Sequence, residues 1–305
     1  MGSVLECLPQ GSRVAVLRLR SLGDCVLTTP ALDILKRSRP DLHLAVVVED
    51  RFRALFADNP DVDEILPPHA GVLRAWRPRM VVNLHGGRRS AWMTALAGAG
   101  HRAGFGHFRH RWVYNARIPR AQEILGVDRT VHTAEHLASA MFWLGAAVGE
   151  IPRAKLRVPA GARPPAGQSI AVIHPVAATP RKTWRADGFL AVARRLRELG
   201  MEPVFIGSAA DDLTPFAGFR TLAGAPLAEI KTLLAGAALF VGNDSGPAHM
   251  AAAFGLPVVV IFGDSDPAIW GPWRTVSEVV TVPGGIGQVR TEQVLDALAR
   301  LRVPA

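Results

Sequence analysis

The sequence predicts an α/β fold made of two doubly wound parallel sheets, and three observations support this prediction. Short, nearly continuous apolar runs alternate with helical stretches, as expected of strands that are buried on both faces. Residues 159–167, rich in proline and glycine, interrupt this periodicity near the middle of the 305-residue chain. Beyond them the strand–helix pattern restarts. We therefore expect two Rossmann-like domains, residues 1–160 and 161–305, that face a central cleft.

In the first half, apolar runs predict strands, and the stretches between them predict helices. Pro30 leaves two alternatives for the first helix, which reaches about residue 37: a kink at the proline, or a start at Thr28 or Thr29 with Pro30 in the first turn. The cationic region 101–120 is interpreted as a loop. The expected strands are residues 14–19, 42–48, 64–66 and 80–84, and the later helices are 52–57, one ending near 97, and 133–144.

In the second half, the pattern is again strand and helix in alternation. The run Ile170-Ala171-Val172-Ile173 resembles Val14-Ala15-Val16-Leu17, which is a weak indication of a repeat. The final amphipathic helix is a candidate to pack back on the first domain. The expected strands are residues 169–174, 203–206, 239–241, 258–262 and 279–282, and the expected helices are 186–199, 226–235, one after 246, and 291–301.

Composition limits the function classes. The net charge is +9, and arginine supplies nearly all of the positive charge. Nucleic acid, an anionic membrane or phosphorylated substrate, and arginine-rich codon usage would each explain this charge. The absence of a basic run with interleaved aromatics argues against nucleic acid. Cys7 and Cys25 are too few for a disulfide framework or a cysteine metal cage, and they fit a reducing cytoplasm.

The turn at residues 242–249, Gly-Asn-Asp-Ser-Gly-Pro-Ala-His, connects a predicted strand to an alanine-rich helix. Such a turn directs backbone N–H groups and the positive end of the helix dipole at one point, which suits a phosphate. A purely structural strand–turn–helix unit remains the alternative.

In each of the two domains, one charged residue after the first strand is a candidate for the site. Asp24 lies at a helix start, where it either caps the helix or acts as a general base facing the cleft. Lys182 is one of four lysines in an arginine-dominated chain, and it is either a point charge for a phosphate or a solvated loop residue.

Two further sets of residues are less specific. His132, Glu135 and His136 match the H-x-x-E-H pattern of inverzincin metallopeptidases, although the α/β plan disagrees with that class. Arginines near strand ends of the first domain are candidates to bind phosphate or carboxylate; these are Arg51, Arg53, Arg88, Arg89, Arg109 and Arg111.

Five motifs in order along nearly the whole chain resemble glycosyltransferase family 9, the ADP-heptose:lipopolysaccharide heptosyltransferases. They are residues 22–32 (LGDCVLTTPAL), 83–86 (NLHG), 174–184 (HP to KTW), 242–249 (GNDSGPAH) and 262–267 (FGDSDP). The resemblance implies a GT-B fold, with an N-terminal acceptor domain and a C-terminal nucleotide-sugar domain. It further implies an inverting, metal-independent transfer of a sugar, most directly heptose from ADP-heptose, to a lipopolysaccharide-type or other glycan acceptor.

The resemblance also implies roles for individual residues. Asp24 matches the family's catalytic base, and Arg89 and Arg109 lie near its cationic acceptor contacts. The implied donor-binding residues are Lys182, Asp211, Asp244, Ser245, Gly246, Pro247 and His249. We expect the amides at Ser245 to Pro247 to contact the diphosphate and the Asp244 side chain to cap the following helix.

Partners and location follow from the same resemblance. We expect a nucleotide-sugar donor, an anionic glycolipid or glycan acceptor, no cofactor, no metal and no nucleic acid. The expected location is the cytoplasm, with a peripheral contact at the cytoplasmic face of the inner membrane. Asp211 replaces a longer glutamate, and this departure leaves the donor open. The alternatives are a non-catalytic nucleotide-sugar-binding protein on the same fold and a GT-B transferase with a different donor.

Overall fold

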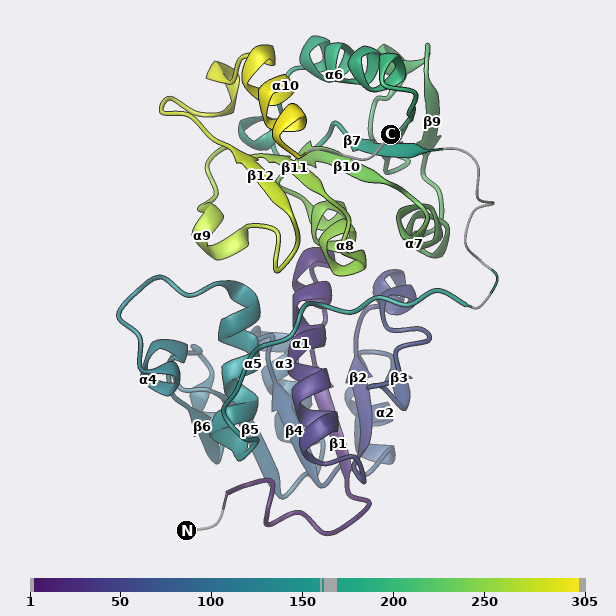
Figure 1. Ribbon diagram of the computed structural model, residues 1–305. Helices are drawn as coiled ribbons and strands as arrows, with labels where there is room; N and C mark the ends of the chain where they lie inside the picture. Colours follow the sequence, from purple (N-terminus) through teal and green to yellow (C-terminus); the bar gives the residue numbers. More distant parts are fainter. Residues whose placement is uncertain (1–2, 160, 162–168, 302–305) are drawn as a thin grey trace. The chain divides into compact units, whose positions relative to one another are not determined.

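The computed structural model describes residues 3–159, 161 and 169–301, which form two compact units, Met1–Lys155 and Leu156–Ala305 (Figure 1). Most of the proline- and glycine-rich segment that marks the expected domain boundary, namely residues 160 and 162–167, lies outside the described residues. Within those ranges no helix is both long and apolar enough to cross a membrane.

The first unit contains a six-stranded parallel sheet in the order β3-β2-β1-β4-β5-β6. Its strands are β1 (Arg13–Leu17), β2 (His43–Val47), β3 (Glu64–Leu66), β4 (Met80–Asn83), β5 (His101–Phe105) and β6 (Ala116–Ile118). Its helices are α1 (Leu22–Ser38), α2 (Ala70–Ala75), α3 (Arg88–Leu96), α4 (Ala121–Leu125) and α5 (Thr133–Leu144), with 3₁₀ turns η1 (Asp50–Leu55) and η2 (Arg111–Val113).

Side chains of β1 alternate between the two helical layers of this unit. Ala15 and Leu17 belong to a core cluster with Leu73 of α2 and Met93 of α3. Helices α1 and α5 pack against each other on the opposite face of the sheet (Figure 1). Both faces are therefore covered, which explains why the strands are nearly continuous apolar runs.

The second unit repeats the plan, with a parallel sheet in the order β12-β11-β10-β7-β8-β9. Its strands are β7 (Ile170–His174), β8 (Glu202–Gly207), β9 (Arg220–Ala223), β10 (Leu239–Asn243), β11 (Val258–Ile261) and β12 (Ser277–Val280). Its helices are α6 (Ala186–Glu198), α7 (Leu227–Ala235), α8 (Gly246–Phe254), α9 (Pro267–Trp270) and α10 (Thr291–Arg300), with 3₁₀ turns η3 (Pro180–Lys182), η4 (Thr214–Phe216) and η5 (Ile286–Gln288).

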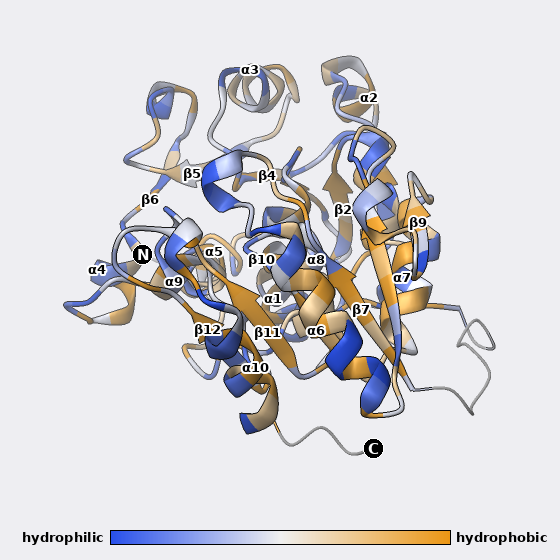
Figure 2. Ribbon diagram, turned by 90° about the horizontal axis from the view of Figure 1, so that it is seen from above, coloured by the Kyte–Doolittle hydropathy of each residue, from blue (hydrophilic) through white to orange (hydrophobic). Residues whose placement is uncertain are grey.

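One core cluster joins the central strands of this sheet to α6 and α10 through residues such as Ile173, Phe189 and Leu298. Strands β7 and β11 are mostly hydrophobic, whereas α6 and α10 contain both hydrophilic and hydrophobic residues (Figure 2). Helix α10 packs on β11, β12 and α6 of its own unit. The buried residues of α10 thus belong to the core of the second unit.

Several predicted elements differ from the observed ones. The expected loop at 101–120 contains strands β5 and β6, and the expected helix at 52–57 is the 3₁₀ turn η1. The strand expected at 279–282 lies two residues earlier, as β12. Strand β5 was missed because a glycine interrupts its apolar pattern. A Cβ at Gly104 would lie 2.6 Å from the Tyr114 ring, so the glycine makes room for an aromatic side chain.

Helix α1 runs without interruption from Leu22 to Ser38 with Pro30 inside it, so neither Thr28 nor Thr29 is its cap. Proline lacks the N–H that would bond to the carbonyl four residues earlier. That carbonyl belongs to Val26, and the Thr29 hydroxyl donates to it at 2.8 Å. The neighbouring threonine thereby offsets the missing backbone hydrogen bond.

Candidate functional site

Each sheet has a switch point, where the strand order reverses direction. It lies between β1 and β4 in the first unit and between β7 and β10 in the second. In open α/β sheets, ligands bind outside the carboxyl ends of the strands at such points. The predicted site residues Asp24, Lys182 and Asp244 all follow strands that border a switch point.

In the first unit, Asp24 is held in a fixed orientation at the start of α1. Its Oδ2 accepts hydrogen bonds from the Ser21 backbone N–H at 3.2 Å and from the Ser21 hydroxyl at 2.8 Å. Its other oxygen forms an ion pair with Arg18. Ser21 is the N-cap residue of α1, and Asp24 is the third helical residue. Asp24 is therefore not the N-cap itself but the acidic partner of Ser21 in a capping box. The Asp24 side chain keeps 17% of its surface exposed.

Arg18 connects the two central strands of this edge, because it also donates to the Leu84 carbonyl that follows β4. Nearby, the Asn83 side chain accepts from the backbone N–H groups of His85 and Gly86, at 3.0 Å each. Burial lowers the pKa of His85, and the positive charges of Arg18 and Arg20 lower it further. The imidazole is therefore neutral at physiological pH. Sequence reasoning missed Arg18, although its place at the end of β1 was a signal.

Cys25, the neighbour of Asp24, is a structural residue. Its side chain is buried, and its thiol donates to the Arg18 carbonyl. Burial raises the pKa of Cys25 to about 12, so the group stays a thiol and is not a nucleophile.

In the second unit, the turn after β10 meets the end of β7. Ser245 is the N-cap of α8, and its hydroxyl lies 3.0 Å from Nδ1 of His174. Burial lowers the pKa of His174 to about 4, against an opposing effect of Asp211. A neutral imidazole thus fixes the Ser245 side chain. Pro247 has no N–H, which corrects the expectation that its amide contacts a phosphate; Ser245 and Gly246 retain theirs.

Asp244 joins three loops of the second unit and does not cap α8, which corrects the role expected of its side chain. Its Oδ2 accepts from Lys182 Nζ at 2.9 Å and from the Ser265 hydroxyl. Asp244 follows β10, Lys182 follows β7, and Ser265 follows β11. The Lys182 side chain is 33% exposed, whereas that of Asp244 is 8% exposed. A partly exposed cation therefore stands over a buried counter-charge.

Two contacts position the loop that carries Lys182. The Trp184 backbone N–H donates to Asn243 Oδ1 at 3.0 Å, and the indole N–H donates to the Val289 carbonyl at 2.9 Å. On the other side, a Cβ at Gly263 would lie only 2.1 Å from the Arg181 carbonyl oxygen. Only glycine allows this approach of the two loops.

The other predicted donor residues lie in the same unit. Asp211 accepts from the Ser208 backbone N–H at 2.6 Å and so closes the turn after β8. His249 lies in α8 and is 5% exposed.

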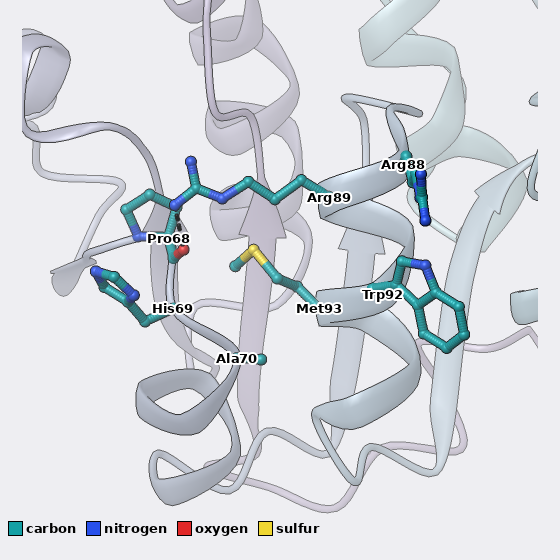
Figure 3. A pocket seen from close by; sticks show the side chains of 7 residues that line it. All are labelled: Pro68, His69, Ala70, Arg88, Arg89, Trp92 and Met93. Carbon is teal, nitrogen blue, oxygen red and sulfur yellow. Dashed lines mark hydrogen bonds between the residues drawn. The ribbon is translucent and has the colours of Figure 1, made fainter.

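Of the two arginines predicted to bind the acceptor, Arg89 lines a pocket at α3. Arg89 donates to the Pro68 carbonyl at 2.7 Å and lines an open pocket of about 550 Å³ (Figure 3). Its lining residues are Pro68, His69, Ala70, Arg88, Arg89, Trp92 and Met93. Arg109 is exposed between β5 and η2 and is not part of that lining.

The H-x-x-E-H segment begins a helix and does not assemble a metal site. His132 is the N-cap of α5, and its Nδ1 accepts from the Ala134 N–H at 3.1 Å. Glu135 pairs with Arg129 at 2.6 Å, and His136 stacks on Phe105 with ring centroids 4.1 Å apart. Burial lowers the pKa of His136 to about 4. In the described parts of the chain, no three or more His, Cys, Asp or Glu side chains could hold a metal ion.

Two Rossmann-type units in one chain are the architecture of the GT-B fold. Residues 70–293 match the family model described as glycosyltransferase family 9 (heptosyltransferase). The chain belongs to this family and is a glycosyltransferase, as the sequence motifs predicted.

Known proteins of this family are similar to the chain over most of its length. Lipopolysaccharide heptosyltransferase 3 of Escherichia coli K12 is 28% identical over 295 residues, which cover 84% of this chain and 83% of that protein. The crystal structure of the glycosyltransferase family 9 protein from Veillonella parvula DSM 2008 matches with a TM-score of 0.83 at 22% identity, covering 96% and 97% of the two chains. The ADP-heptose lipopolysaccharide heptosyltransferase II of E. coli matches with a TM-score of 0.78 at 23% identity, covering 95% and 98%.

Proposed function

We propose that this protein is an inverting, metal-independent heptosyltransferase that uses ADP-heptose and a lipopolysaccharide-type glycan acceptor. Family membership and the names of the two E. coli relatives support heptose, its ADP donor and the acceptor class. The observation that best supports this mechanism is that the two switch points carry opposite charges. The first unit holds the carboxylate of Asp24, and the second holds Lys182 beside the N-terminus of α8.

In this mechanism, Asp24 is the general base. Its carboxylate removes a proton from an acceptor hydroxyl, and the resulting oxygen attacks the anomeric carbon of the donor from the face opposite the diphosphate. The bond from that carbon to the diphosphate breaks, so the configuration inverts. The contacts of Asp24 with Ser21 and Arg18 support this role, because they fix the carboxylate while leaving part of it exposed.

The second unit would stabilise the leaving group. Negative charge grows on the diphosphate as the bond to the sugar breaks, and preorganised positive groups lower the energy of that state. Lys182 and the amides of Ser245 and Gly246 would supply them, which is the work that a metal ion does in other transferases. We place the enzyme at the cytoplasmic face of the inner membrane, where such an acceptor would be built.

The test is the variant Asp24→Asn, assayed for turnover of ADP-heptose and for ADP affinity by calorimetry. We expect turnover to fall by about 10²–10⁴-fold, since that is the usual contribution of a general base, while ADP affinity stays unchanged. Asp41→Asn is the matched control, because it breaks another Asp–Arg pair of the same unit, with Arg39.

Three outcomes would contradict parts of this proposal. Full turnover by Asp24→Asn would exclude the base assignment. A wild-type protein that binds ADP-heptose but transfers nothing to any glycan acceptor would be a nucleotide-sugar-binding protein on the same fold. Transfer from another nucleotide sugar in preference to ADP-heptose would identify a different donor.

A further inference from the structure

Residues 65–122 of the first unit carry the excess positive charge of the whole protein. This stretch contains ten arginines and no lysine, aspartate or glutamate. Its net charge of +10 exceeds the +9 of the full chain, so the remaining residues sum to −1. The stretch extends from β3 to α4 and includes α2, α3 and η2. The basic character of the protein is therefore a local property.

Large apolar side chains are exposed in the same stretch. Trp92 and Leu96, one turn apart on α3, are 48% and 49% exposed, and Trp112 of η2 is 60% exposed. The two indole rings contact each other edge to face, with centroids 5.7 Å apart. With Val72 on neighbouring α2, these residues make up half of the large hydrophobics that are strongly exposed in the described chain. Such a concentration marks an interaction surface.

A small core beneath holds the two tryptophans in place. Ala91 of α3 packs with Val113 and Tyr114 at η2, and the partly buried Phe108 joins them. This core fixes η2 against α3, so the exposed rings are presented on a rigid base. Burying them against a partner therefore costs little additional ordering.

Arginines surround these side chains. Arg88 precedes Trp92 by one turn, and Arg109 and Arg111 lie beside Trp112 in the sequence. In the described part of the chain, no carboxylate forms an ion pair with Arg88, Arg89, Arg109 or Arg111. Figure 3 shows Arg88, Arg89 and Trp92 around one open pocket. We name as the tryptophan–arginine face the set Trp92, Leu96, Trp112, Arg88, Arg89, Arg109 and Arg111.

We propose that the tryptophan–arginine face docks on the surface of a bilayer that contains anionic phospholipids. Tryptophan prefers the interface between headgroups and acyl chains, and arginine pairs with headgroup phosphates while its stem covers apolar surface. Two features favour lipid over single-stranded nucleic acid. Leu96 offers no stacking surface, and the 78° angle between the indoles does not offer two parallel platforms for bases.

The experiment is co-sedimentation of the full chain with vesicles of phosphatidylcholine alone or mixed with phosphatidylglycerol, without donor or acceptor. We expect binding only to the mixed vesicles, and weaker binding as salt is raised. The double variant Trp92→Ser/Trp112→Ser should bind at least about tenfold more weakly. Leu199→Ser/Val276→Ser is the matched control, because it removes side chains that are 45% and 65% exposed on the second unit, and it should bind like wild type.

A second pair of variants tests the charge and avoids any loss of the core beneath the tryptophans. Arg88→Gln should weaken binding to mixed vesicles about fivefold, and Arg194→Gln, an exposed arginine on α6, should not. Equal binding of wild type and Arg88→Gln would overturn the proposal, as would equal binding to both kinds of vesicle. Weaker binding of labelled single-stranded RNA by the tryptophan variant, with vesicle binding unchanged, would assign the face to nucleic acid instead. The inference rests on the membrane location given in the proposed function. Because no sugar transfer is measured, failure of vesicle binding would overturn this face and leave the proposed transfer reaction to its own test.

Discussion

At the scale of single residues, the ion pair between Lys182 and Asp244 holds a positive charge in a fixed position in the second unit. The lysine is partly exposed, while the aspartate that pairs with it is nearly buried and also accepts from Ser265. A buried counter-charge keeps the ammonium group in one place, but it leaves two of its three N–H groups for other acceptors. An incoming diphosphate would meet a cation that is already positioned.

We expect Lys182→Ala to weaken ADP binding about 10- to 100-fold, because a hydrogen bond to a charged group contributes roughly 1.5–3 kcal/mol. Calorimetric titration with ADP measures this change. Lys36→Ala is a suitable control, since it removes a lysine from another ion pair, with Asp63 in the first unit. ADP affinity equal to that of wild type would remove Lys182 from the donor site.

At the scale of elements, the loop after β7 takes its position from its neighbours. The segment from η3 to Trp184 is too short to form a core of its own, and it is fixed by Asn243, Val289 and the backbone at Gly263. The site therefore depends on a close approach of three loops as much as on the charged side chains.

The variant Gly263→Ala tests this dependence. The added methyl would lie 2.1 Å from a carbonyl oxygen, so the loop bearing Lys182 must move. We expect ADP affinity to fall. We also expect the free energy of unfolding to fall by about 1–3 kcal/mol, the usual cost of overpacking, so that the protein unfolds at a lower temperature. Gly218→Ala, where a methyl would meet nothing within 4 Å, should change neither quantity. If Gly263→Ala binds ADP like wild type, the approach of the loops does not position Lys182.

At the scale of the whole molecule, the two units divide the chemistry. Each has the same strand order and its own core, so the chain carries two switch points of one type. The polar groups differ: a carboxylate follows β1, whereas a cation and a helix N-terminus follow β7 and β10. In the proposed mechanism, the base and the leaving-group site thus belong to two copies of one plan.

A thermal-shift panel of nucleotides tests the donor assignment at this scale. ADP-heptose and ADP at 100 times their dissociation constants should stabilise the protein by about 2.7 kcal/mol, and UDP and GDP at the same concentrations should stabilise it less. EDTA should change neither this shift nor turnover. Loss of either on chelation would indicate a metal-dependent mechanism, and a larger shift with UDP would indicate a different donor.

Much of the fold could be predicted because strands buried on both faces leave a direct trace in the sequence. The runs at β1, β2, β4, β7 and β11 are apolar except for at most one residue at a strand end, and each begins and ends close to its prediction. Strands β5, β6 and β9 left no such trace. They are short or carry arginine and glycine, and their neighbours in the sheet stabilise them more than their own composition does.

The sequence nominated the residues of the candidate site but not their contacts. Motif order identified Asp24, Lys182 and the turn 242–249, because reactive groups follow strand ends in this architecture. The partners of these groups, Arg18, His174 and Ser265, were not chosen as site residues. Arg18 lies only six residues before Asp24. His174 and Ser265 come from other segments than the residues they contact, and the pairing of β7, β10 and β11 brings those segments together.

The sequence by itself determined that this protein is a two-unit α/β glycosyltransferase, because periodic burial and motif order are local properties of the chain. Only the tertiary structure decided what each charged group does. It assigned Asp244 to Lys182 instead of to a helix cap and packed α10 on its own unit. It also gathered exposed tryptophans among arginines that have no carboxylate partner in the described residues. The physical reason is that a hydrogen bond, an ion pair or an exposed patch depends on distances between segments that the order of residues does not specify.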